Sequence, residues 1–143
     1  MTDQDVRLPP NARALRIYIA GKWSDKDTIK KYMNQLQKVG HTITHDWTSY
    51  ESNVENKKSD MAFKDVQGVA FADVLIVVMT DPKYQYRGSF TELGVALGLL
   101  KDVYIICSDD NSDCKTNVFF HHPSIVHVKS WDECLSKLKE IDK

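Results

Sequence analysis

The sequence predicts an α/β fold: a flavodoxin/Rossmann-like, doubly wound sheet of five mainly parallel strands, in the order 2-1-3-4-5, with helices on both faces. Short apolar runs alternate with segments of helical periodicity along the chain. One run, residues 74–79, is wholly apolar and rich in β-branched residues, as in a central strand covered on both faces. The 143 residues are enough for one domain with a real core.

The first strand–helix unit begins at residues 16–20, R-I-Y-I-A, which we expect to form a strand that ends at the loop G-K-W-S. Ser24 and Asp27 have the spacing of a capping box for the helix that follows. The apolar residues of this helix share one face up to Gly40: Ile29, Tyr32, Met33, Leu36 and Val39. Residues 41–46 predict a shorter, less apolar strand near a sheet edge, followed by Trp47 and a polar loop over residues 48–58.

A second helix is expected from about residue 59 to 71, with Asp65 interrupting an inward face of Ala62, Val66, Val69 and Ala70. The central strand and a polar loop with Pro82 follow. Ser89 is a candidate N-cap for a third helix. Its expected apolar positions are Phe90, Leu93, Val95, Leu97 and Leu100.

The last third of the chain predicts a fourth strand at residues 103–107, a loop at 108–116 and a fifth strand at 125–128. Ser130 and Glu133 form a capping box for a final helix. Leu135, Leu138 and Ile141 are its expected inward residues.

The composition favours a cytoplasmic protein that binds neither a nucleic acid polymer nor a membrane. The formal net charge is −1, from 19 basic and 20 acidic residues. Residues 1–14 are polar, resemble neither a signal peptide nor a membrane span, and are predicted to be flexible. Residues 15–143 are predicted to form a single domain. Three cysteines without C-x-x-C spacing favour reduced structural thiols.

The predicted topology also predicts where a ligand binds. In an open parallel sheet, ligands bind outside the carboxyl ends of the strands, at the point where the strand order reverses. Here that point lies between strands 1 and 3, where the loop G-K-W-S meets the loop T-D-P-K-Y-Q-Y-R-G-S. Glu92 is expected in the first turn of the next helix, where the helix dipole favours an ionised carboxylate. The alternative is a first-turn residue without any catalytic role.

Motifs for common cofactors are absent from the sequence. No G-x-G-x-x-G follows a strand and no G-x-x-x-x-G-K-[ST] occurs, so no cofactor is expected. No metal site is expected either. His121 and His122 are adjacent and point apart, and His41 and His45 lie on a strand without a matching partner, so structural or solvent-exposed roles are favoured for all four.

Three segments resemble a known family: I-Y-I-A-G-K-W at 17–23, K-D-V-Q-G-V-A-F-A-D-V-L-I at 64–76 and G-S-F-T-E-L-G-V-A-L at 88–97. Together they resemble the nucleoside 2-deoxyribosyltransferases, including the branch of 2'-deoxynucleoside 5'-monophosphate N-glycosidases. The likeness extends from Arg16 to about Ile141. It implies an enzyme that cleaves or transfers the N-glycosidic bond of a 2'-deoxynucleoside or its 5'-monophosphate.

The resemblance also implies roles for individual residues. Glu92 corresponds to the glutamate that attacks C1' of deoxyribose, Asp65 to the aspartate that assists departure of the base, and Tyr18 to the tyrosine that orients the nucleophile. Asn117 corresponds to an asparagine that reaches the neighbouring subunit's site. One departure concerns the sugar's 5' end: Tyr86 stands where the transferases have an acidic residue and the monophosphate branch has serine.

Elementary chemistry agrees with these roles. Retaining cleavage of a glycosidic bond needs one ionised carboxylate close to C1' and a proton source near the leaving base. Asp65, on a largely apolar helix face near a second carboxylate, should have a raised pKa and suit the second role. The alternative for Asp65 is a partly exposed residue on an imperfect amphipathic helix. Trp23 and Trp47 could stack on a base, although core or rim packing is equally compatible with Trp47.

The predicted substrate contacts surround these catalytic residues: Gly21, Lys22, Trp23, Asp46, Trp47, Tyr86, Arg87, Gly88, Ser89 and Asn117. Of these, Lys22, Arg87, Gly88 and Ser89 could form a cationic, N–H-rich pocket for a 5'-phosphate.

Phe119 and Phe120 predict a subunit interface in a homodimer or larger homo-oligomer with a shared active site. The alternative is that both phenylalanines fold back onto the fifth strand of their own sheet. Two other functions stay open. One is a nucleotide sensor without catalysis. The other, less favoured, is a phosphoacceptor receiver-like module, because the acidic cluster that such a module has after its first strand is replaced here by G-K-W-S.

Overall fold

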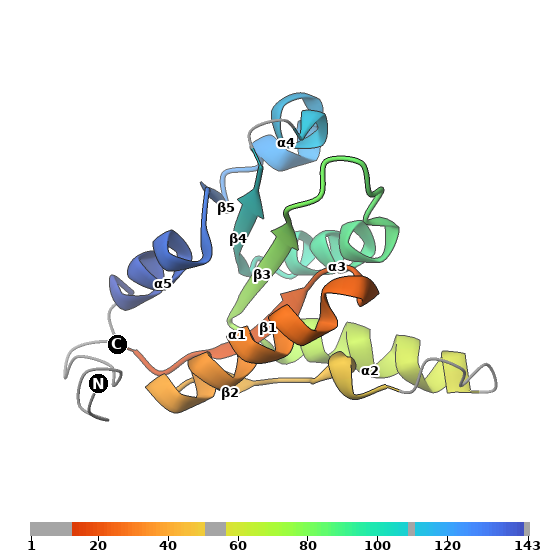
Figure 1. Ribbon diagram of the computed structural model, residues 1–143, viewed down its shortest axis with the longest axis vertical. Helices are drawn as coiled ribbons and strands as arrows, with labels where there is room; N and C mark the ends of the chain where they lie inside the picture. The colour runs from red at the N-terminus through yellow and green to blue at the C-terminus, as the bar shows by residue number, and fades with distance from the viewer. Residues whose placement is uncertain (1–12, 51–56, 109–110, 142–143) are drawn as a thin grey trace.

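The computed structural model describes residues 13–50, 57–108 and 111–141. A single sheet runs through it, and its neighbouring strands are all parallel, in the order β2-β1-β3-β4-β5 (Figure 1). The strands are β1 (Arg16–Ala20), β2 (Thr42–Ile43), β3 (Val74–Met79), β4 (Asp102–Cys107) and β5 (Ile125–Val128). The predicted fold class and strand order are confirmed.

Helices cover both faces of the sheet, as right-handed crossovers require. The helices are α1 (Lys26–Val39), α2 (Lys58–Phe71), α3 (Arg87–Gly98), α4 (Ser112–Thr116) and α5 (Trp131–Lys139). On one face α1 and α5 lie side by side, and the rings of Tyr32 and Trp131 stack between them at 4.0 Å. On the other face α2 packs against α3. In the described parts of the chain, no helix is long and apolar enough to cross a membrane.

The first unit follows the prediction except at the helix start. A 3₁₀ turn at Trp23–Asp25 precedes α1, whose N-cap residue Asp25 makes no side-chain hydrogen bond. The capping box predicted at Ser24 is therefore wrong, because the chain enters the helix through this extra turn. Gly40 ends the helix with φ 123°, a conformation that glycine adopts at low cost.

The edge strand β2 is shorter than the predicted strand at residues 41–46. His41, just before β2, has a structural role, because its buried Nδ1 accepts a hydrogen bond from the Leu15 N–H at 3.0 Å. All six residues of β3 are buried, as predicted. The inward face predicted for the second helix is only partly correct. Val69 is fully buried, but Ala62 and Val66 are exposed.

The cysteine prediction is wrong for two of the three residues. Cys107 at the end of β4 forms a disulfide with Cys114 in α4, whereas Cys134 is free and buried. The predicted loop at 108–116 contains α4, which lies beyond the end of β4 (Figure 1) and brings the two cysteines together. Sequence spacing alone does not show this return of the chain.

The last segment confirms the capping box at Ser130, whose side chain accepts a hydrogen bond from the Glu133 N–H at 3.1 Å. Phe120 is buried and stacks on Phe90 of α3, with ring centroids 5.4 Å apart, while Phe119 is 66% exposed. The predicted flexible segment at residues 1–14 lies outside the described residues except for its last two. Arg13 is held there by a hydrogen bond to the Ile141 carbonyl.

Candidate active site

A cavity of about 370 Å³ opens at the carboxyl ends of β1 and β3, beside α2 and the start of α3. This is the predicted position, where the strand order reverses. The volume is within the range of small-molecule sites. The predicted site residues that line the cavity are Tyr18, Gly21, Lys22, Trp23, Trp47, Asp65, Tyr86, Gly88, Ser89 and Glu92.

Glu92 lies in the second turn of α3, not in the first. The helix begins at Arg87 after Tyr86, which has φ 52° and makes no side-chain cap, so the predicted cap at Ser89 is wrong. The helix dipole acts mainly within the first turn, and it is not what governs Glu92. Burial raises the pKa of Glu92 to about 7. The hydrogen bond from Tyr18 lowers this pKa, and the negative charge of Asp65 raises it by a smaller amount.

Tyr18 connects the central sheet to this carboxylate. It is the third residue of β1 and is 1% exposed, and its hydroxyl donates a hydrogen bond to Oε2 of Glu92. Burial, followed by the negative charges of Glu92 and Asp65, raises the pKa of Tyr18 far above its ordinary value. The hydroxyl therefore remains a proton donor at any physiological pH and can hold Glu92 in one orientation.

Asp65 faces the same cavity from α2, with two partners that come from the segment after β2. The Tyr50 hydroxyl lies 3.1 Å from Oδ1 of Asp65, and Nε2 of His45 lies 3.4 Å from the same oxygen. Burial raises the pKa of Asp65, as predicted, although hydrogen bonds from Tyr50 and Tyr18 and the charge of His45 oppose this shift. The raised pKa suits a group that holds a proton for the leaving base.

Gly68 allows α2 to approach the sheet closely. A Cβ atom at this position would lie 2.8 Å from Cβ of His45 and 2.9 Å from Cδ2 of Tyr18. The Gly68 carbonyl also accepts a hydrogen bond from the Thr44 hydroxyl at 2.7 Å. Because Asp65 is three residues earlier on the same helix, this contact determines how near Asp65 lies to Tyr18.

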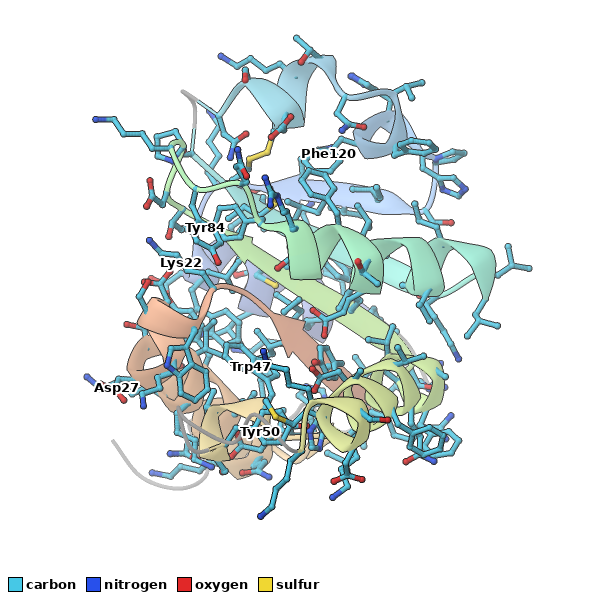
Figure 2. All side chains as sticks on the ribbon, turned by 90° about the vertical axis from the view of Figure 1, so that its right-hand side faces the viewer. Lys22, Asp27, Trp47, Tyr50, Tyr84 and Phe120 are labelled. Atoms are coloured by element: carbon cyan, nitrogen blue, oxygen red, sulfur yellow. A yellow bond between two sulfur atoms is a disulfide. The ribbon has the colours of Figure 1, made fainter. Side chains whose placement is uncertain are left out.

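Two tryptophans form an aromatic wall. Trp47 is 7% exposed, and its indole N–H donates a hydrogen bond to the Ile19 carbonyl at 2.6 Å. Trp23 is 36% exposed, and the two rings lie 6.3 Å apart at 41°. Trp47 is therefore fixed by the core, whereas Trp23 is more exposed, and Nζ of Lys26 lies 4.5 Å from the centre of its ring. Figure 2 shows Trp47 above Tyr50 beside α2.

The rim of the cavity near Lys22 is closed by the loop after β3. Nζ of Lys22 lies 2.7 Å from Oδ2 of Asp81 and 5.5 Å from the centre of the Tyr84 ring. Lys22 and Tyr84 are both labelled in Figure 2. The Tyr86 hydroxyl, 3.1 Å from the Asp81 N–H, accepts its hydrogen bond and secures the loop. Lys22 is therefore a cation at the cavity edge that already has an anionic partner.

Three predicted site residues are not brought to this cavity. Asp46 instead caps the 3₁₀ turn at Trp47–Ser49, where it accepts hydrogen bonds from Thr48 and Lys30. Arg87 lines an adjoining cavity of about 420 Å³ formed by residues 83–88. The Asn117 side chain accepts a hydrogen bond from the Phe119 N–H at 3.0 Å, which caps the next 3₁₀ turn.

The sequence interpretation missed Tyr50, His45 and Gly68. A histidine at the carboxyl end of a predicted parallel strand is placed at the ligand-binding edge, which was a usable signal for His45. A glycine inside a helix costs about 1 kcal/mol relative to alanine, so Gly68 pointed to a close contact. Tyr50 had no such signal, because it lies in a segment without periodicity.

Comparison with known proteins agrees with the geometry. The family model described as nucleoside 2-deoxyribosyltransferase matches residues 17–123. A search among curated proteins found no match. Within the described residues, no cluster of three or more His, Cys, Asp or Glu side chains could hold a metal ion.

Proposed function

Because the chain belongs to the nucleoside 2-deoxyribosyltransferase family, we propose that it cleaves or transfers the N-glycosidic bond of 2'-deoxynucleosides or their 5'-monophosphates. The observation that carries this proposal is the pair of carboxylates, Glu92 and Asp65, that line one cavity from two helices. Tyr18 interacts with both of them. We assign the catalytic role to residues 15–143 acting as one domain.

In this mechanism the free oxygen of the Glu92 carboxylate attacks C1' of the deoxyribose. The bond from C1' to the base nitrogen breaks, its electron pair stays on the base, and Asp65 supplies a proton to the base. A covalent deoxyribosyl–Glu92 ester remains. Water or a second base then attacks C1' and gives up a proton to the ionised Asp65, the ester bond breaks, and the Glu92 carboxylate is regenerated with overall retention.

The protonation of the site supports this assignment. A pKa of about 7 for Glu92 reflects burial and, in part, repulsion by Asp65. Glu92 is therefore mainly protonated below about pH 7 and mainly ionised above it. The productive form has the proton on Asp65 and the charge on Glu92. Because Glu92 must be ionised to attack, base release should rise as the pH rises through about 7, which is measured as the acidic limb of a pH–rate profile.

A direct assay tests the proposal. The purified protein is incubated with each deoxynucleoside and each deoxynucleoside 5'-monophosphate, with and without a second free base, and released bases are separated by chromatography. Release without an acceptor indicates hydrolysis, and exchange indicates transfer. Binding of these compounds without any base release would overturn the proposal and favour the nucleotide sensor.

We further propose that Lys22, with the backbone N–H groups near Gly88 and Ser89, receives a 5'-phosphate. All three residues line the cavity, whereas Arg87 does not. A phosphate must compete with Asp81 for Lys22. A higher kcat/KM for monophosphates than for nucleosides, lost in Lys22→Met, would support this phosphate contact. Equal use of both substrate classes would contradict it.

We also propose a homodimer or larger homo-oligomer with shared sites. Val118 and Phe119 are 72% and 66% exposed next to Asn117, and Phe63 on α2 is 65% exposed. Such apolar surface suits a contact between copies. Light scattering measures the assembly. If inactive Asn117→Ala and Glu92→Ala proteins regain activity on mixing, the site is shared, whereas a fully active monomer would contradict it.

A further inference from the structure

We propose that Tyr50 is a positioning residue for Asp65, with the same relation to that carboxylate as Tyr18 has to Glu92. The inference rests on the proposed function and adds a residue for which the family resemblance implies no role. Tyr50 lies directly after the 3₁₀ turn at Trp47–Ser49, and it lines the cavity beside α2 (Figure 2).

The contacts of the Tyr50 hydroxyl place it at the centre of a small network. Its oxygen lies 3.1 Å from Oδ1 of Asp65, 2.5 Å from Nε2 of His45 and 3.4 Å from the Met61 carbonyl. The ring centroids of Tyr50 and His45 lie 5.4 Å apart, so the two partners of Asp65 also contact each other. One carboxylate oxygen of Asp65 is thereby engaged, and the other is left for the substrate.

The direction of these hydrogen bonds follows from proton counting. A tyrosine hydroxyl has one proton, and Oδ1 of Asp65 can accept it in the ionised carboxylate and also as the carbonyl oxygen of the protonated acid, whose own proton is then on Oδ2. Tyr50 therefore donates to Asp65 and accepts from the N–H at Nε2 of His45, which defines the tautomer of the imidazole. Hydrogen bonds to a charged group are stronger than those between neutral groups, so this arrangement restrains the side chain of Asp65.

The groups around Asp65 come from three other elements. Tyr50 and His45 belong to the segment after β2, Tyr18 to β1 and Glu92 to α3. Burial is the main cause that raises the pKa of Asp65, and the hydrogen bond from Tyr50 is the largest effect that opposes it. Removal of the Tyr50 hydroxyl should therefore raise the pKa of Asp65 further.

The test compares Tyr50→Phe with Tyr32→Phe in the full-length protein. Both variants lose one phenolic hydroxyl, but Tyr32 stacks on Trp131 and does not line the cavity. We expect kcat of Tyr50→Phe to fall about tenfold, with KM nearly unchanged, because a charged hydrogen bond is lost while the ring is kept. Tyr32→Phe should match the wild type. His45→Gln, whose amide can still donate to Tyr50, should have a smaller effect.

A second measurement does not depend on catalysis. Titration of the Asp65 carboxyl carbon by ¹³C NMR, assigned with Asp65→Asn, should show a midpoint at higher pH in Tyr50→Phe and an unchanged midpoint in Tyr32→Phe. An unchanged midpoint in folded Tyr50→Phe overturns the inference, even if kcat falls. If the wild type releases no base, the proposed function fails. The titration then still decides whether Tyr50 holds Asp65.

Discussion

The two carboxylates of the cavity are held in similar ways but in different surroundings. Glu92 contacts Tyr18, which is 1% exposed on a central strand of the sheet. Asp65 contacts Tyr50 and His45, which belong to the segment after the short edge strand β2. Each carboxylate has a tyrosine partner, yet one pair is part of the core and the other lies near the surface.

This difference separates the chemical roles of the two groups. The Glu92 side is anchored to a buried strand through Tyr18, which suits a nucleophile that must be oriented toward one carbon atom. The Asp65 side is polar and closer to solvent, which suits a group that gives up a proton and must regain it in each cycle. Two carboxylates in one cavity thus acquire distinct properties from their surroundings.

The largest expected effect is that of Glu92→Ala. Loss of the nucleophile should reduce base release by about 10⁴-fold or more, to the detection limit, because no covalent intermediate can form. Chromatography of released base measures the activity, and circular dichroism checks that the domain is folded. Wild-type turnover in the folded variant would eliminate the nucleophile assignment.

Asp65→Asn should have the next largest effect. Removal of the proton source is expected to lower kcat by about 10²- to 10³-fold, which is typical for the loss of a general acid. The loss should be smaller for substrates whose base leaves readily without protonation. A uniform loss across good and poor leaving groups would count against this role for Asp65.

Tyr18→Phe tests the Glu92 side with a minimal change. The ring and its packing are kept, but the hydrogen bond to Glu92 is lost, so kcat should fall about 10- to 100-fold. This hydrogen bond also lowers the pKa of Glu92, so without it the acidic limb of the pH–rate profile should move to higher pH. Tyr32→Phe is the matched control. An unmoved limb would show that Tyr18 does not act on Glu92.

The smallest effect concerns stability. Because the pKa of Glu92 is about 7 in the folded protein and 4.5 as its ordinary value, folding favours its protonated form. The stability from this site is complete below about pH 4.5 and is lost as the pH rises through about 7. The Glu92→Gln variant should therefore be more stable than the wild type at pH 8, by about 3 kcal/mol, and equally stable at pH 4, as measured by denaturant unfolding. A less stable variant at pH 8 would contradict the burial of Glu92.

Local patterns were sufficient for the architecture. The fully apolar run at residues 74–79 predicted a central strand, and the structure confirms it at Val74–Met79. The fifth strand, the final helix cap at Ser130 and the edge position of β2 were predicted from short-range signals alone. The cavity position followed from strand order, because loops after parallel strands meet at one edge of the sheet.

Helix starts and long-range pairs could not be predicted in the same way. α3 begins at Arg87 because Tyr86 adopts a left-handed conformation secured by Asp81, an arrangement that has no local signature. The disulfide between Cys107 and Cys114 depends on where α4 lies. Asp46 accepts a hydrogen bond from Lys30 instead of lining the cavity.

The sequence by itself determined the order of the strands from periodicity and the family from motif spacing. The family resemblance also implied which two carboxylates to consider. Only the tertiary structure decided their environments. The burial that raises the pKa of Glu92 and the Tyr50–His45 contacts of Asp65 arise from elements distant in the chain. Dielectric surroundings depend on what packs nearby in space, which no local pattern encodes.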